Sequence, residues 1–421
     1  MSTIAFVGMT HLGLVSASSV AAKGFRTLCF DPDAALIGRL SAGELPVSEP
    51  DLDDQIAGNA DQTFTSNWTD LSAADVVYIA PDVPTDDRGI SDLSGIEALV
   101  GQVLNHLSPE AVLVVLCQVP PGFTRGINRR PERLYYQVET LVFGRAVERA
   151  MEPERYIIGC ANPADPLPPA FAEILGAFGC PILPMRYESA ELAKISINMC
   201  LVASISVANT MAEVCEHIGA DWSEIVPSLK LDRRIGQYSY LAPGLGIAGG
   251  NLERDLATVM RLAEAHGTDA GVVAAQVANS SHRKGWAART VQRLGLEAAT
   301  LAVWGLAYKE NTHSVKNSPS LHTLAQIPDA VLHLHDPMVA DDVLSFPESQ
   351  QIARKDTALG ALDGAMALMI LTPWPVYREI APAEIAARLA GDIVLDPYRV
   401  LDADAARAAG LRHFTLGVGD A

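Results

Sequence analysis

Two polar side chains within an apolar stretch are the first candidates for chemistry in this sequence. Lys194 and Asn198 are four residues apart, so on a helix they share one face. Their neighbours are mainly Ala, Ile, Leu and Val, and burying a lysine among such residues is costly unless a carboxylate or a substrate oxygen meets it. Elsewhere a Lys and an Asn at this spacing usually mark a solvated helix face. Here the apolar surroundings favour a functional role for the pair.

A glycine-dense segment is the second candidate. Residues 243–255 have the sequence PGLGIAGGNLERD. Because glycine loses more conformational freedom on folding than any other residue, such a turn is costly unless something must approach its backbone. The segment leads directly into Arg254 and Asp255. We therefore predict an active-site loop here, with Asn251 at its end.

A dinucleotide fingerprint lies near the N-terminus, where residues 8–13 have the sequence GMTHLG. Gly8 can make the tight turn and Gly13 allows close helix packing, whereas Thr10 adds a side chain where the backbone normally approaches a pyrophosphate. Asp31, about twenty residues further along, is placed to accept a hydrogen bond from a ribose 2′-hydroxyl and would repel a 2′-phosphate. The pattern predicts NAD rather than NADP; the alternative is a structural domain with an altered pocket.

The elements that must position these residues are those of a doubly wound α/β protein. Short apolar runs occur in two series, at 3–8, 26–30, 75–80, 111–116 and 155–159, then at 301–305, 331–335, 365–371 and 392–396. A helical pattern at 11–23 follows the first of these runs. Between the series, residues 188–218 contain neither Gly nor Pro and predict a long spine helix. We expect two Rossmann-like domains joined by this helix and a helical dimerisation region, divided as 1–185, 186–295 and 296–421.

Composition restricts the partners and the compartment. The 421 residues include 31 Lys and Arg against 50 Asp and Glu, a formal net charge of −19 that opposes nucleic-acid binding and requires local basic groups for anionic ligands. The N-terminus enters a strand pattern at once, so we expect no signal peptide, and we expect no apolar run of membrane-spanning length. Six scattered cysteines have neither metal spacing nor a disulfide framework. We expect a cytoplasmic protein without a metal.

The glycine loop resembles a motif of the UDP-glucose/GDP-mannose dehydrogenase family. That motif is P-G-x-G-F-G-G-S-C-F-P-K-D, and residues 243–255 align with it without a gap. Asn251 stands where the family has its nucleophilic cysteine. An amide nitrogen has a delocalised lone pair and cannot replace a thiolate, so the resemblance implies an altered reaction centre.

Further segments extend the resemblance along the N-terminal half. Residues 83–85 and 119–122 resemble the family's V-P-T-P and S-T-V-P-P-G loops, and 136–141 resembles Y-N-P-E-F-L. Gln118 occupies the position of a threonine that the family places beside the catalytic water, and Glu139 that of the catalytic glutamate. The cofactor positions that follow from the fingerprint and these loops are Gly8, Thr10, His11, Leu12, Gly13, Asp31, Pro84 and Thr85.

The family's division of labour implies a role for each matched residue. Cys is the covalent nucleophile, Lys and Asn stabilise an oxyanion, Asp lies near the Lys or the water, and Glu handles hydrolysis. This chain keeps all but the nucleophile, so the predicted catalytic positions are Glu139, Lys194, Asn198, Asn251, Asp255 and Gln118. Cys117 is a conceivable replacement thiol, but alternation at a strand end would aim it away from the side chain of Gln118.

The C-terminal half resembles the nucleotide-sugar end of the family. Residues 304–312 and 318–320 resemble G-L-A-F-K-x-N-T and S-P, and 232–236 resembles a segment whose arginine reaches the substrate of a neighbouring subunit. Lys316 replaces an arginine, so the diphosphate grip changes from a bidentate fork to a point charge. The predicted substrate positions are Leu141, Arg234, Tyr240, Gly246, Gly249, Lys309 and Lys316.

Three functions remain open. The leading one is NAD-dependent oxidation at C6 of a UDP-hexose or related nucleotide sugar by a homodimer, stopping at the aldehyde or reaching the acid slowly through its hydrate. The second is redox-neutral epimerisation with bound NAD, for which losing the thiol would be an advantage. The third is a non-catalytic binding subunit, favoured by Thr10, Gln118, Asn251 and Lys316. The residues do not distinguish uridine from guanosine, or one sugar from another.

Overall fold

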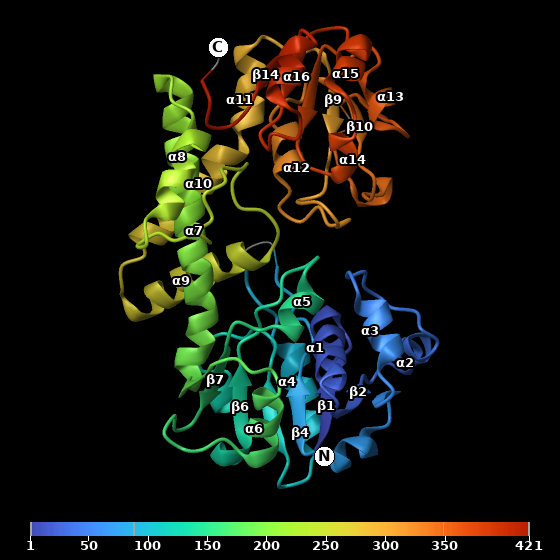
Figure 1. Cartoon of the computed structure of the whole chain (residues 1–421), viewed down its shortest axis with the longest axis vertical. Helices are drawn as coiled ribbons and strands as arrows, with labels where there is room; N and C mark the ends of the chain where they lie inside the picture. Colours follow the sequence, from blue (N-terminus) through green and yellow to red (C-terminus); the bar gives the residue numbers. More distant parts are fainter. Residues whose placement is uncertain (1, 87–88, 348, 420–421) are drawn as a thin grey trace. The chain divides into compact units, whose positions relative to one another are not determined.

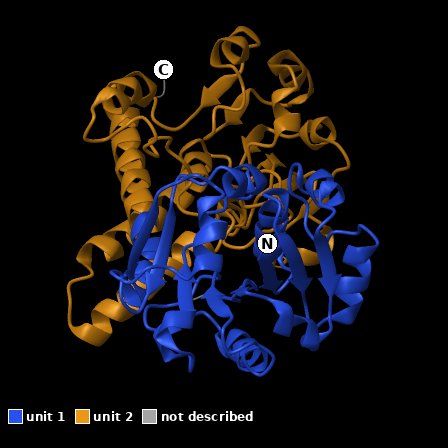
Figure 2. Ribbon diagram, turned by 60° about the horizontal axis from the view of Figure 1, so that its bottom comes forward, with its two compact units in different colours: residues 1–197 blue, residues 198–421 orange. Residues whose placement is uncertain are grey.

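The structure, a computed structural model, describes residues 2–86, 89–347 and 349–419. The chain forms two compact units, residues 1–197 and 198–421 (Figures 1 and 2). Each unit contains a mainly parallel sheet with helices against it, so the fold comprises two Rossmann-like domains, as the sequence predicts. The division falls inside a single long helix. The three-part division at 185 and 295 remains a proposal.

The sheet of the first unit has eight strands in the order β3-β2-β1-β4-β5-β6-β7-β8. Five of them were predicted, whereas β3, β6 and β8 were not. All neighbouring pairs are parallel except β6 and β7, which are antiparallel. The strands are β1 Thr3–Val7, β2 Arg26–Phe30, β3 Gln62–Thr65, β4 Val76–Ile79, β5 Val112–Val115, β6 Leu134–Gln137, β7 Tyr156–Cys160 and β8 Ile182–Arg186.

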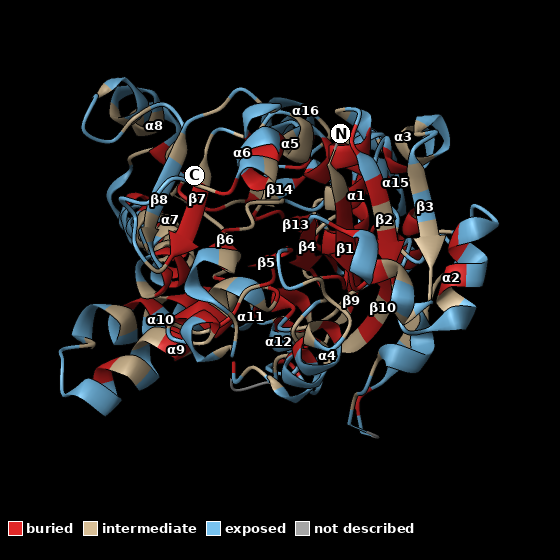
Figure 3. Ribbon diagram, turned by 90° about the horizontal axis from the view of Figure 1, so that it is seen from below, coloured by how far each residue is buried: buried red, intermediate tan, exposed pale blue. Residues whose placement is uncertain are grey.

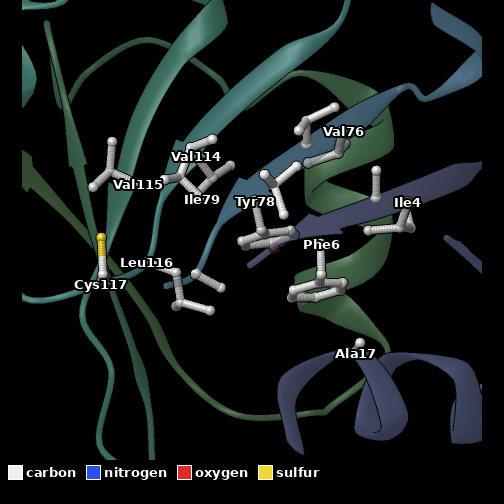
Figure 4. Close-up of a cluster of buried hydrophobic side chains, with 14 of the residues drawn as sticks. Ile4, Phe6, Ala17, Val76, Tyr78, Ile79, Val114, Val115, Leu116 and Cys117 are labelled. Carbon is white, nitrogen blue, oxygen red and sulfur yellow. The ribbon is translucent and has the colours of Figure 1, made fainter. Parts of the chain in front are cut away.

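The strand order reverses between β1 and β4, and in open α/β sheets ligands bind beyond the carboxyl ends of the strands at such a point. The core beneath it is apolar: Phe6 of β1 stacks on Tyr78 of β4 with ring centroids 4.6 Å apart. Figure 4 shows both rings among the apolar side chains of β1, β4 and β5, with Ala17 of α1 below them in this view. Continuous apolar strands are expected for a sheet covered on both faces, and Figure 3 shows the central strands as mainly buried.

The helices of the first unit follow its strands. α1 begins at His11, directly after the turn of residues 8–10 that follows β1, and ends at Ala22. Asp33 caps α2, because its carboxylate accepts hydrogen bonds from the backbone N–H groups of Ala35 and Leu36. The others are α2 Ala34–Ser41, α3 Leu52–Gly58, α4 Ser94–Leu104, α5 Ala146–Met151 and α6 Pro169–Gly176, with short 3-10 turns at Trp68–Ala73, Thr124–Gly126 and Pro131–Arg133.

Helix α7, Tyr187–Ile218, is the predicted spine helix, and it begins one residue earlier than the glycine-free run suggests. Among the described residues it is the one helix long and apolar enough to cross a membrane, by length and composition only. This corrects the expectation that no apolar run has such a length. Scattered Ser and Asn residues break up the apolar run in α7, while an 18-residue window of it contains at most two charged residues and reaches a mean hydropathy of 1.5. Core helices of soluble proteins pass the same test, so α7 alone is weak evidence for a membrane.

The sheet of the second unit has six strands in the order β11-β10-β9-β12-β13-β14, all parallel. The central four were predicted, and the two edge strands were not. Trp304 is fully buried in β9 and stacks on Tyr377, with ring centroids 4.9 Å apart. The strands are β9 Thr300–Trp304, β10 Val331–His335, β11 Ile352–Arg354, β12 Ala367–Ile370, β13 Ile393–Leu395 and β14 Arg412–Phe414.

The helices of this unit include four before the sheet and five within it. The first four are α8 Trp222–Leu231, α9 Asn251–His266, α10 Gly271–Lys284 and α11 Trp286–Arg293. Those between the strands are α12 Pro319–Leu324, α13 Ala358–Leu362, α14 Pro375–Arg378, α15 Pro382–Arg388 and α16 Ala403–Ala408, with a 3-10 turn at Asp341–Val343.

A pair of glycine substitutions tests the packing of α1. An added Cβ at Gly13 would lie 1.9 Å from the carbonyl oxygen of Gly8, which cannot move without breaking the turn. We expect Gly13→Ala to lower the free energy of unfolding by about 3 kcal/mol. Gly38, inside α2, has open space around the same position, so Gly38→Ala should stabilise the protein by about 0.5–1 kcal/mol. Urea denaturation followed by circular dichroism measures both, and equal effects would contradict the steric argument.

Candidate functional site

Two glycines shape the turn between β1 and α1. Gly8 has a φ of +98°, and a Cβ there would lie 2.7 Å from the backbone nitrogen of Pro81. Gly13, as described above, packs against the carbonyl of Gly8. A side chain at either position would displace the backbone from which a pyrophosphate site is built.

The residues around this turn hold it by side-chain hydrogen bonds. One carboxylate oxygen of Asp31 accepts from the backbone N–H of Met9 at 2.8 Å, and the other accepts from Asp33 at 3.0 Å. The Thr10 hydroxyl donates to the carbonyl of Ala80 at 3.2 Å. Thr10 therefore ties the turn to the end of β4, while Asp31 keeps lone pairs for a ribose hydroxyl.

The remaining predicted cofactor residues lie on both sides of the turn. His11 and Leu12 are buried in the first turn of α1. Pro84 is exposed in the loop after β4, and its carbonyl accepts from the N–H of Asp92 at 2.9 Å. Thr85 forms an isolated antiparallel bridge with Ser91 in the same loop. This loop follows β4 and the turn follows β1, so both lie at the carboxyl edge where the strand order reverses.

Glu139 is the carboxylate that meets Lys194. The Lys194 Nζ lies 3.4 Å from Glu139 Oε2, and the two side chains are only 14% and 18% exposed. The other Glu139 oxygen accepts a short hydrogen bond from the backbone N–H of Leu141, which brings the predicted substrate residue into the same segment. This ion pair thus offsets the desolvation cost of placing the Lys194 ammonium on the apolar face of α7.

A carboxylate on α7 itself holds the loop after β5, and sequence reasoning missed it. Glu191 is fully buried and accepts hydrogen bonds from the backbone N–H groups of Gly122 at 2.6 Å and Thr124 at 2.9 Å. Desolvation raises the pKa of its carboxyl, while these hydrogen bonds act in the opposite direction. The loop begins at half-buried Gln118. An acidic residue three positions before Lys194 was the available signal.

Cys117 does not have the environment of a nucleophile. It is 1% exposed at the end of β5, beside Leu116 in the apolar cluster (Figure 4). Burial raises the pKa of its thiol well above the usual value, and thiolates rather than thiols attack carbonyls. A buried thiol whose pKa is raised in this way is a poor nucleophile.

In the second unit, Asn251 is the first residue of α9 and is exposed. Asp255 follows one helical turn later and is 1% exposed. Its carboxylate accepts a hydrogen bond of 2.5 Å from the amide of Asn198, which is also buried. The predicted oxyanion residue and the predicted aspartate are thus paired beside the helix that presents Asn251.

The glycine loop packs against two partners in the same unit. Gly246 has a φ of +75°, and a Cβ there would lie 2.4 Å from the carbonyl oxygen of Ser280. Gly249 has a φ of +83°, and its Cβ would lie 2.9 Å from the ring of Tyr308. Both positions require glycine, because Ser280 and Tyr308 approach the backbone of the loop closely. These contacts within the protein already account for the glycines, without a ligand.

A basic and polar cluster lies where the loop enters α9. Lys316 passes beside Gly250, where an added Cβ would lie 3.5 Å from its side chain. Asn317 donates to the carbonyl of Gly249 at 3.0 Å and makes a short hydrogen bond to Glu253, which also pairs with Lys284 at 2.9 Å. Sequence reasoning missed Asn317, Glu253 and Lys284, because their grouping depends on contacts between distant segments.

Asp336 fixes the backbone that leads to Lys309. Its carboxylate accepts from the N–H groups of Leu306 at 2.7 Å and Ala307 at 3.1 Å, and from the indole of Trp374 at 3.1 Å. The Lys309 ammonium lies 5.8 Å from the centre of the Tyr308 ring, a cation–π distance. Lys309 thus lies by Tyr308, against which Gly249 packs, and Lys316 lies by the next residue of the loop, Gly250.

Arg234 and Tyr240 lie apart from this cluster. The Arg234 side chain is 88% exposed, and its guanidinium pairs with Asp232 at 2.5 Å. Tyr240 is half exposed. Within the described residues, no group of three or more His, Cys, Asp or Glu side chains is arranged to hold a metal ion.

The two sheets, the glycine turn after β1 and the carboxylate at the end of β2 define a dinucleotide-binding α/β oxidoreductase. Family models match the chain in three consecutive parts: the NAD binding domain at residues 2–167, the central domain at 188–281 and the UDP binding domain at 302–403. The chain belongs to the UDP-glucose/GDP-mannose dehydrogenase family, and NAD is its cofactor.

Similar proteins cover nearly the whole chain. UDP-glucose 6-dehydrogenase of Pseudomonas aeruginosa is 30% identical over 440 residues, 98% of this chain and 96% of that protein. UDP-glucose 6-dehydrogenase TuaD of Bacillus subtilis is 28% identical over 437 residues, 99% of this chain and 93% of that protein. The structure of a UDP-glucose dehydrogenase from Pyrobaculum islandicum aligns with a TM-score of 0.83 and 26% identity, covering 98% and 97% of the two chains.

Substitution of Asp31 tests cofactor selection. Asp31→Ala removes the carboxylate that accepts from Met9 and that would repel a 2′-phosphate. We expect NAD to bind about tenfold more weakly, a loss of about 1.4 kcal/mol, while the preference for NAD over NADP narrows. Calorimetric titration with both cofactors measures the two affinities. Asp33→Asn, which can still cap α2, is the control; equal affinity of the unmodified protein for NAD and NADP would contradict the assignment.

Proposed function

We propose that this protein oxidises the C6 alcohol of a UDP-hexose or related nucleotide sugar with NAD, and that it stops at the aldehyde or reaches the acid slowly. One observation carries the proposal. Asn251 occupies the start of α9, one turn before the buried Asp255–Asn198 pair, so a carboxamide stands where the aligned family motif has a thiol.

The first oxidation requires a proton acceptor and a hydride acceptor but no covalent intermediate. NAD supplies the hydride acceptor. The alcohol proton leaves to a base, and the Glu139–Lys194 pair is the candidate: its 3.4 Å separation lets the two groups share a proton and hold the developing alkoxide. Asn251 can donate a hydrogen bond to the alcohol or aldehyde oxygen from its amide.

The second oxidation is where the chemistry must differ. A thiolate would add to the aldehyde, and hydride loss from that adduct would give a thioester. A carboxamide cannot make this adduct. The alternative is hydration of the aldehyde to a gem-diol, from which hydride loss gives the acid directly. That route lacks covalent assistance, so we expect it to be slow.

The proposed anchor for the nucleotide end of the substrate is in the second unit. Lys309 and Lys316 supply positive charge near the glycine loop in a chain whose net charge is −19. The matched UDP binding domain supports a nucleotide-sugar ligand. Because an ammonium has no planar fork, we expect these lysines to grip a diphosphate less specifically than an arginine would.

Product stoichiometry tests the proposal. With NAD and a panel of nucleotide sugars, the unmodified protein should form close to one NADH per product, with an aldehyde that hydroxylamine traps and no covalent adduct at residue 251. Asn251→Cys should shift the ratio toward two NADH and an acid. The shift depends on Gln118 and Glu139 positioning a water. Absorbance at the NADH band and mass spectrometry of the product provide both values.

Asn251→Ser is the matched control, because it keeps a small polar side chain without a thiol and should leave the ratio near one. Rapid release of a carboxylate with two NADH by the unmodified protein would contradict the proposal, and Cys117→Ser would then identify or exclude that thiol. Turnover without net NADH would favour epimerisation. The absence of NADH and of any sugar product would favour a binding subunit.

We also propose that the chain functions as a homodimer through α7. Val207, Met211, Val214 and Ile218 recur at intervals of four, three and four residues and are 41–69% exposed. An apolar stripe with this spacing is the pattern by which helices pair. A symmetric pair would bury it on both chains, and exposed Arg234 would then be free to reach the neighbouring site.

A matched pair of charge substitutions tests the dimer. Val214→Glu places a carboxylate in the stripe, and twofold symmetry repeats it, so the variant should be monomeric at micromolar concentration and should lose most of its activity. Val376→Glu, at a residue of α14 with nearly the same exposure (41% against 42%), should leave the oligomer unchanged. Light scattering coupled to size-exclusion chromatography measures the mass. A monomeric unmodified protein that still turns over would refute the arrangement.

A further inference from the structure

The proposed chemistry leaves one buried ionisable pair unused. His11 Nε2 lies 2.9 Å from Glu49 Oε2, and the two side chains are 8% and 0% exposed. Neither residue belongs to the groups that would touch the reacting carbon. A carboxylate is costly to bury unless several donors meet it, so its other contacts indicate what it does.

Two backbone groups of a distant segment complete the coordination of Glu49. Its Oε2 also accepts from the N–H of Gly144 at 3.0 Å, and its Oε1 accepts from the N–H of Ala146 at 2.7 Å. The ring of His11 stacks on Phe143 at 4.1 Å between centroids. His11 and Glu49 therefore contact segment 139–146 at three residues, Phe143, Gly144 and Ala146.

The pair connects two parts of the site. His11 is the first residue of α1 and follows the cofactor turn directly. Segment 139–146 begins with Glu139, continues through Leu141 and ends at the start of α5. The hydrogen bonds of Glu49 are thus a bridge between the backbone that receives the cofactor phosphates and the segment that carries the Glu139 carboxylate.

The backbone close to Glu49 has an unusual conformation. Asp51, two residues later, has a φ of +66°, which is a left-handed conformation that non-glycine residues rarely adopt. Leu52 then begins α3 and is fully buried. Such strain persists only where the surroundings determine it, and here the surroundings include three donors converging on one carboxylate.

We propose that His11 and Glu49 are positioning residues that couple cofactor binding to segment 139–146, so that NAD orders the segment carrying Glu139 and Leu141. Its consequence for catalysis rests on the proposed function, but the coupling itself requires only NAD binding. Linkage makes it reciprocal: a segment that is already ordered increases the affinity for NAD.

Two substitutions separate coupling from simple stability. Glu49→Gln keeps the size of the side chain but has a single acceptor oxygen, so its amide nitrogen faces an N–H donor from Ala146, or from Gly144 and His11. His11→Phe keeps an aromatic ring to stack on Phe143 and removes only the nitrogen that contacts Glu49. Asp75→Asn is the control, because Asp75 also accepts a backbone N–H (Thr3, 2.8 Å), but at the amino end of β1.

Hydrogen exchange of the peptides covering residues 140–147, with and without saturating NAD, measures the coupling. In the unmodified protein and in Asp75→Asn, NAD should slow exchange of Gly144 and Ala146 about tenfold. In Glu49→Gln and in His11→Phe the slowing should fall below about twofold at NAD concentrations that saturate each variant. Thermal unfolding without cofactor shows whether each variant folds. If Glu49→Gln does not fold, His11→Phe alone tests the coupling.

The coupling would be overturned by the absence of any NAD effect on this segment in the unmodified protein, or by variants that keep the full effect. Neither result depends on turnover, so failure to find a nucleotide-sugar substrate leaves the measurement intact. Where turnover is found, the variants should lower kcat more than they raise the KM for NAD. A change confined to that KM would contradict the positioning role.

Discussion

A carboxylate removed from water needs several hydrogen-bond donors, and in this protein the backbone N–H groups of loops provide many of them. Glu49 holds segment 139–146, Glu191 holds the loop after β5, Asp31 holds the cofactor turn and Asp336 holds the backbone before Lys309. Loops at the carboxyl edge of a sheet are the least constrained parts of an α/β fold. The hydrogen bonds of these four carboxylates hold the loops in defined conformations. The positions of the other proposed site residues depend on those conformations.

The proposed absence of a thiol at residue 251 need not abolish the site, because the other proposed catalytic groups are held in pairs. The carboxamide of Asn251 lies on the first turn of α9, while the groups that would stabilise charge are held independently, Asn198 by Asp255 and Lys194 by Glu139. The Lys194–Glu139 pair lies within the first unit and the Asn198–Asp255 pair within the second. A centre of this kind can lose covalent catalysis and keep electrostatic stabilisation, which is the larger contribution in many enzymes.

Much of the fold could be predicted from the sequence, because central strands are continuous apolar runs and α7 lacks helix breakers. The edge strands and the central strand β6 could not. β11 and β14 have three residues each and include Arg354 or His413, and β8 contains Pro184, so none carries the signal of a buried strand. The fingerprint, the glycine loop and the Lys194–Asn198 pair were visible because their members are close in sequence. Glu49 was not, since its partners are 38 to 97 residues away.

The single antiparallel pair in the first sheet determines where α7 starts. Because β7 runs opposite to β6 and β8 runs with β7, the chain leaves β8 at the edge where the other strands begin. Tyr187 marks that edge, for its hydroxyl donates to the carbonyl of Leu134 at the start of β6. Seven residues later, a rise of about 10 Å, Lys194 reaches Glu139 beyond the end of that strand. Had β7 kept the common direction, the helix would have left from the opposite edge and carried its lysine away from the sheet.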